Sequence, residues 1–289
     1  MDGIIVINKP KGVTSHDVVY KVKKIFNEKV GHTGTLDPNA TGVLPLLIGE
    51  GTKLSKYLIE HDKIYKVRLT LGKKTDSADV EGNVLEEREV DKSILNVQNV
   101  QNILNSFIGK NEQIPPMYSA IKVNGKKLYE YARKGQKVDI QPRKIEIFEI
   151  NLINIENLSI NFTVHCSKGT YIRSLCEQLA EKLETIGYME ELERLKVGNF
   201  YINDSVTIEE LDENKGNNEF LNEHFITFEK HFENNNEIIL NDRKLSLFLN
   251  GVKLSIELED GVYKIYNNGN FIGIGTVKNN LLKRDVILR

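Results

Sequence analysis

The sequence predicts an α+β fold with a mixed, largely antiparallel central sheet, followed by a small β-rich module. Three observations support this prediction. Helical and strand-like segments are mixed without the regular strand–helix–strand rhythm of a parallel sheet. Short strands separated by Asn and Gly turns crowd the region after residue 236. A chain of 289 residues is also long enough for one large domain plus a small one.

The elements follow in this order. Residues 4–8 form a short buried strand, and Ser15 is a suitable N-cap for a helix whose apolar face extends from Val18 to Phe26. Residues 63–72 alternate apolar and polar side chains, which predicts a half-buried strand. The remaining predicted elements are a helix at 92–108 ended by Gly109, strands at 144–153 and 158–166, and a helix at 170–186 followed by Gly187.

The domain boundary is predicted near residue 235. Residues 203–236 are rich in Asn and Glu and show little periodicity, which is typical of a connecting segment. We therefore expect a larger domain at 1–235 and a small one at 236–289. The small module is close to the lower size limit for independent stability, so it is expected to pack on the larger body.

Charge is distributed unevenly along the chain. The net charge of −2 is an average over an acidic stretch at 205–260, with 13 acidic against 5 basic residues, and a basic one at 120–145. The basic stretch carries 8 Lys or Arg against 2 acidic residues. Such a strip is an adequate electrostatic footprint for RNA, although it is also compatible with an ordinary solvated surface.

Two cysteines, Cys166 and Cys176, lie in apolar periodic segments and are predicted to be buried free thiols. No apolar run approaches the roughly 20 residues of a membrane helix, and the start of the chain lacks a signal-peptide pattern. These features predict a cytoplasmic protein without a membrane partner. The histidines lack metal-ligand spacing, so no metal is expected.

The most informative segment is 31–42, which contains three glycines around Asp37 and Pro38. Glycines permit positive φ and close approach of a ligand, and a proline biases the preceding residue toward an extended conformation. The segment therefore predicts a rigid loop that presents one carboxylate at a fixed angle. The alternative is a tight connection in which Asp37 only caps a turn.

The run GHTGTLDPNATG, followed by GVLPLLIGEGTK, closely resembles the signature of the TruB family, the tRNA pseudouridine-55 synthases. The resemblance implies a pseudouridine synthase fold with a PUA-like RNA-binding module. It also implies isomerisation of the T-arm uridine of tRNA, without metal, nucleotide or redox cofactor. Asp37 matches the catalytic aspartate of that family.

Other segments extend the resemblance. Tyr65, at the start of the alternating strand, resembles the active-site tyrosine and could stack on uracil. Arg173 matches the arginine that pairs with the catalytic aspartate, which would keep that carboxylate ionised. Tyr171 is expected to support the base pocket, and Leu192 to line it.

The resemblance also implies RNA contacts. His32 matches a histidine that holds the target nucleotide after extrusion from the stack. Lys9 lies in the family's first motif, KPKGVTS at residues 9–15, which places cations near the signature loop. Lys126 and Lys127 lie in the basic stretch among aromatic residues. Asp76 and Asp79 match a further motif and are expected to support the site indirectly.

Several alternatives remain open at this point. Asp37 could attack the sugar or the base, or remove a sugar proton. The chain could be a non-catalytic RNA-binding or RNA-folding protein on the same scaffold, or its glycine-rich loop could cradle a phosphate, although the Gly-Lys-Ser/Thr ending is missing. The favoured hypothesis is a stand-alone, monomeric tRNA enzyme rather than a member of the guide-RNA-dependent, dyskerin-type branch.

Overall fold

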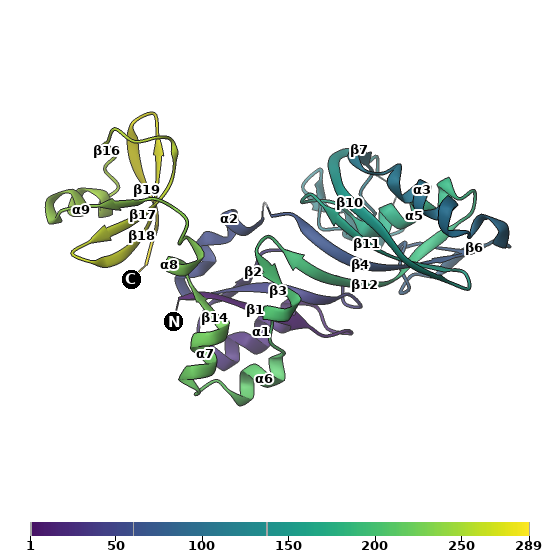
Figure 1. Cartoon of the computed structure of the whole chain (residues 1–289), viewed down its shortest axis with the longest axis horizontal. Coiled ribbons are helices and arrows are strands. Elements are labelled where there is room, and N and C mark those ends of the chain that lie inside the picture. Colours follow the sequence, from purple (N-terminus) through teal and green to yellow (C-terminus); the bar gives the residue numbers. More distant parts are fainter. Residues whose placement is uncertain (1, 60, 137, 289) are drawn as a thin grey trace.

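The computed structural model describes residues 2–59, 61–136 and 138–288, which form a large body and a smaller module beside it (Figure 1). The body is built on a ten-stranded sheet and the module on a five-stranded one. Two short hairpins stand apart, β5 (Lys73–Thr75) with β6 (Val84–Glu87) and β8 (Lys122–Val123) with β9 (Lys126–Lys127). The α+β prediction is confirmed.

The sheet of the body is mixed and largely antiparallel, as predicted. Along its main path the strands follow in the order β14 (Phe225–Thr227), β1 (Gly3–Lys9), β3 (Thr41–Ile48), β12 (Gly187–Val197), β4 (Lys63–Leu71), β11 (Ser159–Cys166), β10 (Arg143–Glu156) and β7 (Gly109–Gln113). Two short strands lie off this path, β2 (Val30–His32) beside β3 and β13 (Phe200–Tyr201) beside β12. The contact of β3 with β12 is parallel, and the other ladders described in this sheet are antiparallel.

Helices cover the two halves of this sheet separately. Helices α3 (Val97–Asn105) and α5 (Ile172–Lys182) pack against strands β4, β10 and β11 in one apolar cluster. Helices α1 (Ser15–Phe26) and α6 (Ile208–Glu213) pack against β1 and β3 in another. The remaining helices are short: α2 (Ser55–Ile59), α4 (Leu128–Ala132), α7 (Asn218–His224), α8 (Phe228–His231), α9 (Asp242–Leu249) and the 3₁₀ helices η1 (Gly49–Leu54), η2 (Lys92–Ile94) and η3 (Ile202–Asp204).

The prediction that Ser15 caps the first helix is wrong. Thr14 is the N-cap, because its hydroxyl accepts from the Asp17 amide at 3.1 Å and the Asp17 carboxylate accepts from the Thr14 amide at 2.9 Å. This reciprocal arrangement satisfies two amides that the helix leaves free. Ser15 is instead buried in the body, where its hydroxyl is available for a tertiary contact.

The predicted helix at 92–108 is interrupted. A 3₁₀ turn at η2 precedes Asn96, whose side chain accepts from the Asn99 amide at 2.9 Å and starts α3. An asparagine that can bond nearby amides favours a helix start over a helix interior, which explains the break. The predicted helix at 170–186 is also shorter than expected, since α5 spans Ile172–Lys182.

Strand β12 was not predicted from the sequence, although it lies between β3 and β4 near the centre of the sheet. Its register against β4 shifts between Met189 and Glu191 and again between Arg194 and Lys196. Each shift inserts one extra residue and reverses the inside–outside alternation. A strand with two bulges and several glutamates therefore lacks the period-two pattern by which strands are recognised.

Residues 203–236 contain more structure than predicted. They form α6, α7, β14 and α8, and β14 pairs with β1 at the edge of the large sheet. Thr207, Asn217 and Thr227 each cap one of these helices through their side chains. The short lengths of the elements conceal them in a search for long periodic segments.

The module consists of α9 and a five-stranded sheet. Its strands follow in the order β15 (Glu237–Ile239), β17 (Gly261–Asn267), β18 (Asn270–Lys278), β19 (Leu281–Ile287) and β16 (Leu254–Ser255). This sheet is consistent with the predicted PUA-like module. The expectation that the module packs on the body is confirmed, because Ile274 and Val286 join Leu58 and Phe228 in one buried cluster.

Cys166 and Cys176 are buried free thiols, as predicted. Burial raises the pKa of the Cys166 thiol to about 12, so this group is not poised to act as a nucleophile. Among the helices of the described residues, none has both the length and the apolar composition needed to cross a membrane.

Candidate active site

The signature segment 31–42 connects β2 with β3. Residues of the first motif, 9–15, hold its backbone through hydrogen bonds. The Ser15 hydroxyl accepts from the Leu36 amide at 2.9 Å and donates to the Leu36 carbonyl at 3.1 Å. The carbonyl of Pro38 accepts from the Gly12 amide at 2.9 Å and from Lys9 Nζ at 3.0 Å. These bonds hold the backbone on both sides of Asp37, which is the kind of support that a rigid loop requires.

One glycine of the segment has a clear conformational role. Gly42 has a φ of +101°, and a Cβ at this position would lie 2.2 Å from the carbonyl oxygen of Arg194. A side chain is excluded there both by the left-handed backbone and by the close approach of β12. Gly31 and Gly34 do not adopt positive φ, and Gly34 lines the cavity described below.

Arg173 extends from the first turn of α5 to the Asp37 carboxylate. Its Nε lies 3.1 Å from Asp37 Oδ2, and its Nη2 lies 3.4 Å from Asp37 Oδ1. The guanidinium is itself held by the Tyr118 carbonyl, which accepts from Nη2 at 2.9 Å. Only 7% of the Arg173 side chain is exposed, compared with 35% for Asp37. The arginine is thus a buried support, and the carboxylate is the partner that solvent or a ligand can reach.

Asp79 binds the other side of the same guanidinium. Its Oδ2 lies 3.4 Å from Arg173 Nη1, and its Oδ1 accepts from the Ser77 hydroxyl and from the Glu81 amide at 3.1 Å. Asp79 is buried and does not line the cavity described below. It acts on the site only through its direct contact with Arg173. This geometry agrees with the expected indirect support, and it adds the specific contact to Arg173.

The Asp37 carboxyl has a raised pKa. Burial is the largest cause, and the negative charge of Asp79 acts in the same direction, while the Arg173 guanidinium and Lys9 oppose both. Asp37 and Asp79 therefore share one arginine, and the positive charge of Arg173 limits the rise in the pKa of Asp37.

Lys9 was expected to contact the substrate, but its ammonium group lies beneath the loop. The side chain is fully buried, and Nζ donates to the carbonyls of Val13 at 2.7 Å and of Pro10 and Pro38 at 3.0 Å. Burial lowers the pKa of Lys9 to about 8, against the opposing effect of the Asp37 charge. These contacts join the first motif to the signature loop and leave no donor of Lys9 at the surface.

Tyr65 on β4 faces Arg194 on β12 across the antiparallel ladder. Burial raises the pKa of Tyr65 to about 12, and the charge of Arg194, which is hydrogen-bonded to the phenol, opposes that rise. Arg194 is 1% exposed; its Nε donates to the Val43 carbonyl at 2.7 Å and its Nη2 to the Gly34 carbonyl at 3.0 Å. One buried guanidinium therefore connects Gly34 of the signature loop, and Val43 directly after the loop, with Tyr65.

A cavity of about 470 Å³ opens above these groups, a volume within the range of small-molecule sites. Of the predicted site residues, it brings together Asp37, Tyr65, Arg173, Tyr171 and Leu192. Sequence analysis assigned no site role to Arg194, Tyr118 or Tyr129, which line the cavity as well. Tyr129 lies in the basic stretch 120–145, whose aromatic residues had been noted, and Tyr118 lies just before it. Arg194 carried no local signal, because its strand was not recognised.

The other predicted contact residues lie outside this cavity. His32 is at the end of β2, and its Nδ1 is buried without a hydrogen-bond partner among the described residues. Burial lowers the pKa of His32, and the Arg194 charge adds to this effect. Lys126 and Lys127 form β9, and Lys127 Nζ lies 3.3 Å from the hydroxyl of Tyr129, a residue of the cavity wall.

Metal-ligating side chains do not gather at this site. Within residues 2–59, 61–136 and 138–288, the structure places no group of three or more His, Cys, Asp or Glu side chains so that it could hold a metal ion.

Comparison with known proteins assigns this architecture. Residues 23–172 match the family model of the TruB family pseudouridylate synthase N-terminal domain. Residues 173–232 match that of the tRNA pseudouridylate synthase B C-terminal domain. Proteins named tRNA pseudouridine synthase B from Clostridium kluyveri and Caldanaerobacter subterraneus are 46% and 42% identical over 286 and 283 residues, with 96% of both chains covered in each case.

Solved structures agree with the fold. A chain of an H/ACA RNP bound to a substrate RNA containing 2'-deoxyuridine superposes with a TM-score of 0.71 at 22% identity, covering 99% of this chain and 85% of the other. A chain of a Cbf5–Nop10–Gar1 complex gives 0.70 at 25% identity, with 99% and 83% covered. Fold and site together define a pseudouridine synthase, an isomerase. Within that class, the chain belongs to the TruB family.

Proposed function

We propose that this protein converts the T-arm uridine of tRNA, position 55, to pseudouridine, with Asp37 as the catalytic carboxylate. The observation that carries the proposal is the contact of Asp37 with Arg173 at 3.1 Å in a cavity walled by tyrosines. Relatives with the name tRNA pseudouridine synthase B support tRNA as the substrate. The match of 31–42 to the pseudouridine-55 signature supports the T arm.

The reaction breaks the bond between C1′ of the ribose and N1 of uracil, turns the base and joins C1′ to C5. C5 gives up its proton to solvent and N1 takes one up, so the overall change is an isomerisation. One ionised carboxylate can start this sequence by attack on the sugar or the base, or by removing a sugar proton. A glycosidase would need a second carboxyl group as acid across the bond. Asp79 is not such a group, because it is buried and engaged with Arg173.

In this proposal Arg173 orients Asp37 and keeps it ionised against the effect of burial. Tyr65 stacks on the uracil, with its hydroxyl directed by Arg194. Tyr171 and Leu192 complete the wall around the base. Lys9 acts through the loop rather than on the RNA, because its three donors are occupied by backbone carbonyls.

The RNA would be held outside the cavity by charge and stacking. His32 faces the nucleotide extruded from the T loop, and Lys126 and Lys127 bind phosphates on the approach to the cavity. Residues 236–289 would form a separate RNA-binding domain next to a catalytic domain at 1–235. The enzyme would act as a cytoplasmic monomer, without a cofactor and without a guide RNA.

The test is tritium release from a tRNA transcript labelled with [5-³H]uridine, in EDTA, by the wild type and by Asp37→Asn. Release at uridine 55 by the wild type alone, with equal tRNA affinity of the two proteins, is the expected result. A transcript with cytidine at position 55 serves as the control for site specificity. Normal turnover by Asp37→Asn would refute the assignment of Asp37, and release from the cytidine transcript would refute the T-arm assignment.

The alternative of a non-catalytic RNA-binding protein is not favoured, because Asp37, Tyr65 and Arg173 are all present and assembled. It predicts tight tRNA binding without any tritium release by the wild type. The same experiment therefore decides between the two functions.

A further inference from the structure

The wall of the active-site cavity contains a buried hydroxyl group without a hydrogen-bond partner. Ser119 is one of the residues that line the cavity of Asp37 and Tyr65, and only 5% of it is exposed. Its Oγ is buried and has no partner among the described residues. A buried hydroxyl in this state disfavours folding, because it has given up its hydrogen bonds to water without replacing them. Such a group in a functional cavity indicates a partner that comes from outside the chain.

Ser119 differs from the other unpartnered groups in its position. Within residues 2–59, 61–136 and 138–288, the other buried side-chain atoms of this kind belong to His32, Thr33, His61 and Thr185. None of these residues lines the cavity. In the part of the chain that the structure describes, Ser119 is therefore the one unpartnered group of this kind in the cavity wall.

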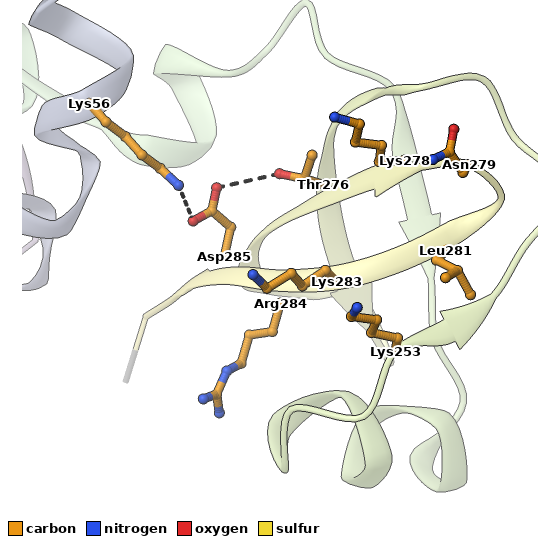
Figure 2. A pocket seen from close by; sticks show the side chains of 9 residues that line it. All are labelled: Lys56, Lys253, Thr276, Lys278, Asn279, Leu281, Lys283, Arg284 and Asp285. Carbon is orange, nitrogen blue, oxygen red and sulfur yellow. Dashed lines mark hydrogen bonds and ion pairs between the residues drawn. The ribbon is translucent and has the colours of Figure 1, made fainter.

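Two threonines show that a hydroxyl group in a cavity wall can have a partner within the chain. Thr170 lines the same cavity, and its hydroxyl donates to the Ser167 carbonyl at 2.9 Å. Thr276 lines a separate cavity of about 400 Å³ on the module, and its hydroxyl donates to Asp285 at 3.4 Å (Figure 2). A position in a cavity wall thus does not by itself explain the unpaired hydroxyl of Ser119.

The backbone on both sides of the Ser119 side chain is fixed. The Tyr118 carbonyl accepts from Arg173 Nη2 at 2.9 Å, and the Ser119 carbonyl accepts from the Tyr129 amide at 3.1 Å. The guanidinium that orients Asp37 therefore also holds Ser119 in the cavity wall. The hydroxyl keeps rotation about χ1, so it can turn toward a substrate without movement of the backbone.

The uracil ring offers acceptors that suit a hydroxyl donor throughout the reaction. Its carbonyl oxygens O2 and O4 flank N3. A turn of the detached base about the axis through N3 and C6 exchanges N1 with C5, and it also exchanges O2 with O4. A donor that binds one carbonyl oxygen before the turn therefore meets the other one after it. A serine hydroxyl supplies such a donor, whereas a carboxylate or a backbone carbonyl only accepts.

We propose that Ser119 is a substrate-contact residue whose hydroxyl donates a hydrogen bond to a carbonyl oxygen of the uracil in the cavity. The inference rests on the proposed function, since it takes the isomerised uracil as the ligand. The bond supplies the partner that the folded chain lacks, and it holds the base beside Asp37 while the bond to the ribose is broken and remade. Because the bond forms only with the base in the cavity, its loss lowers the rate of isomerisation and leaves the stability of the free protein intact.

The decisive variant is Ser119→Ala, with Ser159→Ala as the matched control. Ser159 is also buried, at 7% exposure, but it lies on β11 outside the cavity, and its hydroxyl is 2.9 Å from that of Thr70. The Thr70 hydroxyl donates to Glu190, so the Ser159 hydroxyl is the donor to Thr70. Both variants remove one buried serine hydroxyl, and only the control removes a bond within the chain. The measurements are Tm, tRNA affinity and the single-turnover rate of pseudouridine formation, followed by nucleoside chromatography after digestion.

Ser119→Ala should equal or exceed the wild type in Tm and should keep its tRNA affinity. Its single-turnover rate should fall about 5–10-fold, the effect of one lost neutral hydrogen bond. Ser159→Ala should show the reverse, with Tm lower by roughly 2–3 °C and a rate within about twofold of the wild type. Ser119→Cys, which keeps a weaker donor of similar size, should give an intermediate rate.

Sulfur substitution in the substrate tests whether the contact is direct. A tRNA with 2-thiouridine or 4-thiouridine at position 55 carries a weaker acceptor in place of one carbonyl oxygen. With the wild type, at least one of these two RNAs should react more slowly than the uridine RNA. In Ser119→Ala the same sulfur effect should be reduced, because the two changes remove one shared hydrogen bond.

A wild-type rate in Ser119→Ala would overturn the inference, as would sulfur effects of equal size in the two proteins. A reduced rate together with a fall in Tm like that of the control would also overturn it, because it would show a structural role. Absence of pseudouridine at position 55 with the wild type would refute the proposed function and the inference with it, whereas the other contrary results refute the inference alone.

Discussion

Replacing Arg194 by lysine tests the idea that one buried guanidinium holds the signature loop and Tyr65 together. Arg194 donates to the Val43 carbonyl at 2.7 Å and to the Gly34 carbonyl at 3.0 Å, on opposite sides of Asp37 in the sequence. Lysine keeps the charge, but its single ammonium group cannot reproduce a planar fork with diverging donors. At least one carbonyl should therefore lose its partner.

The expected magnitude follows from these contacts. A buried carbonyl left without a hydrogen bond costs about 1–3 kcal/mol in the free energy of unfolding. For a chain of this size, this corresponds to a fall in Tm of roughly 2–9 °C, at about 2–3 °C per kcal/mol. A shift of the loop by about 1 Å would reduce kcat by roughly 100-fold, because Asp37 would lose its alignment.

The assay combines single-turnover tritium release with thermal unfolding of Arg194→Lys. Arg68→Lys is the matched control. Arg68 lies on the neighbouring strand β4 and pairs with Glu190 at 2.9 Å, and 31% of the Arg68 side chain is exposed. That exposed pair is expected to contribute about 1 kcal/mol or less. Wild-type kcat and Tm in Arg194→Lys would refute the reasoning, as would an equal loss in the control.

Three further predictions concern the same molecule. Asp79→Asn should lower kcat about tenfold or more while tRNA affinity is unchanged, because Arg173 loses its second carboxylate. The acid limb of this variant's pH–rate profile should move to lower pH than in the wild type, since the charge of Asp79 raises the pKa of Asp37. A shift to higher pH would contradict this explanation. Asp37→Asn should be at least as stable as the wild type at pH 7, because the raised pKa of Asp37 makes its ionised form unfavourable for folding. The difference in the free energy of unfolding between the two proteins, measured by urea titration, should vanish below pH 3.8, the ordinary pKa of the group. A clear loss of stability at pH 7 would be the contrary result. Lys126→Ala with Lys127→Ala should weaken tRNA binding and reduce its salt slope by about 1.8, and an unchanged slope would exclude this hairpin from the interface.

The sequence by itself determined the elements whose signals are local. The strand at β4 and the helices α1 and α5 were predicted because their apolar side chains recur with a regular period over many residues. The loop around Asp37 was recognisable because its special residues are adjacent in the chain. The match to a family signature then connected this loop with Tyr65 and Arg173, which periodicity alone would have treated as core and surface residues.

Tertiary structure decided what depends on segments that are distant in the sequence. Strand β12 is defined by its pairing with β3 and β4, and its two bulges remove the alternation that would predict it. The role of Arg194 follows from that pairing. Lys9 resembles a surface cation in the sequence, yet the fold places it beneath the loop with three carbonyl partners.

The same reason explains the candidate active site. Asp79 contacts Arg173 across a sequence separation that no local pattern encodes. Hydrogen bonds and ion pairs depend on the final distance between groups, which only the folded chain sets. The sequence thus determined which chemical groups were available and which family they belong to, whereas the packing of distant strands decided which of them meet.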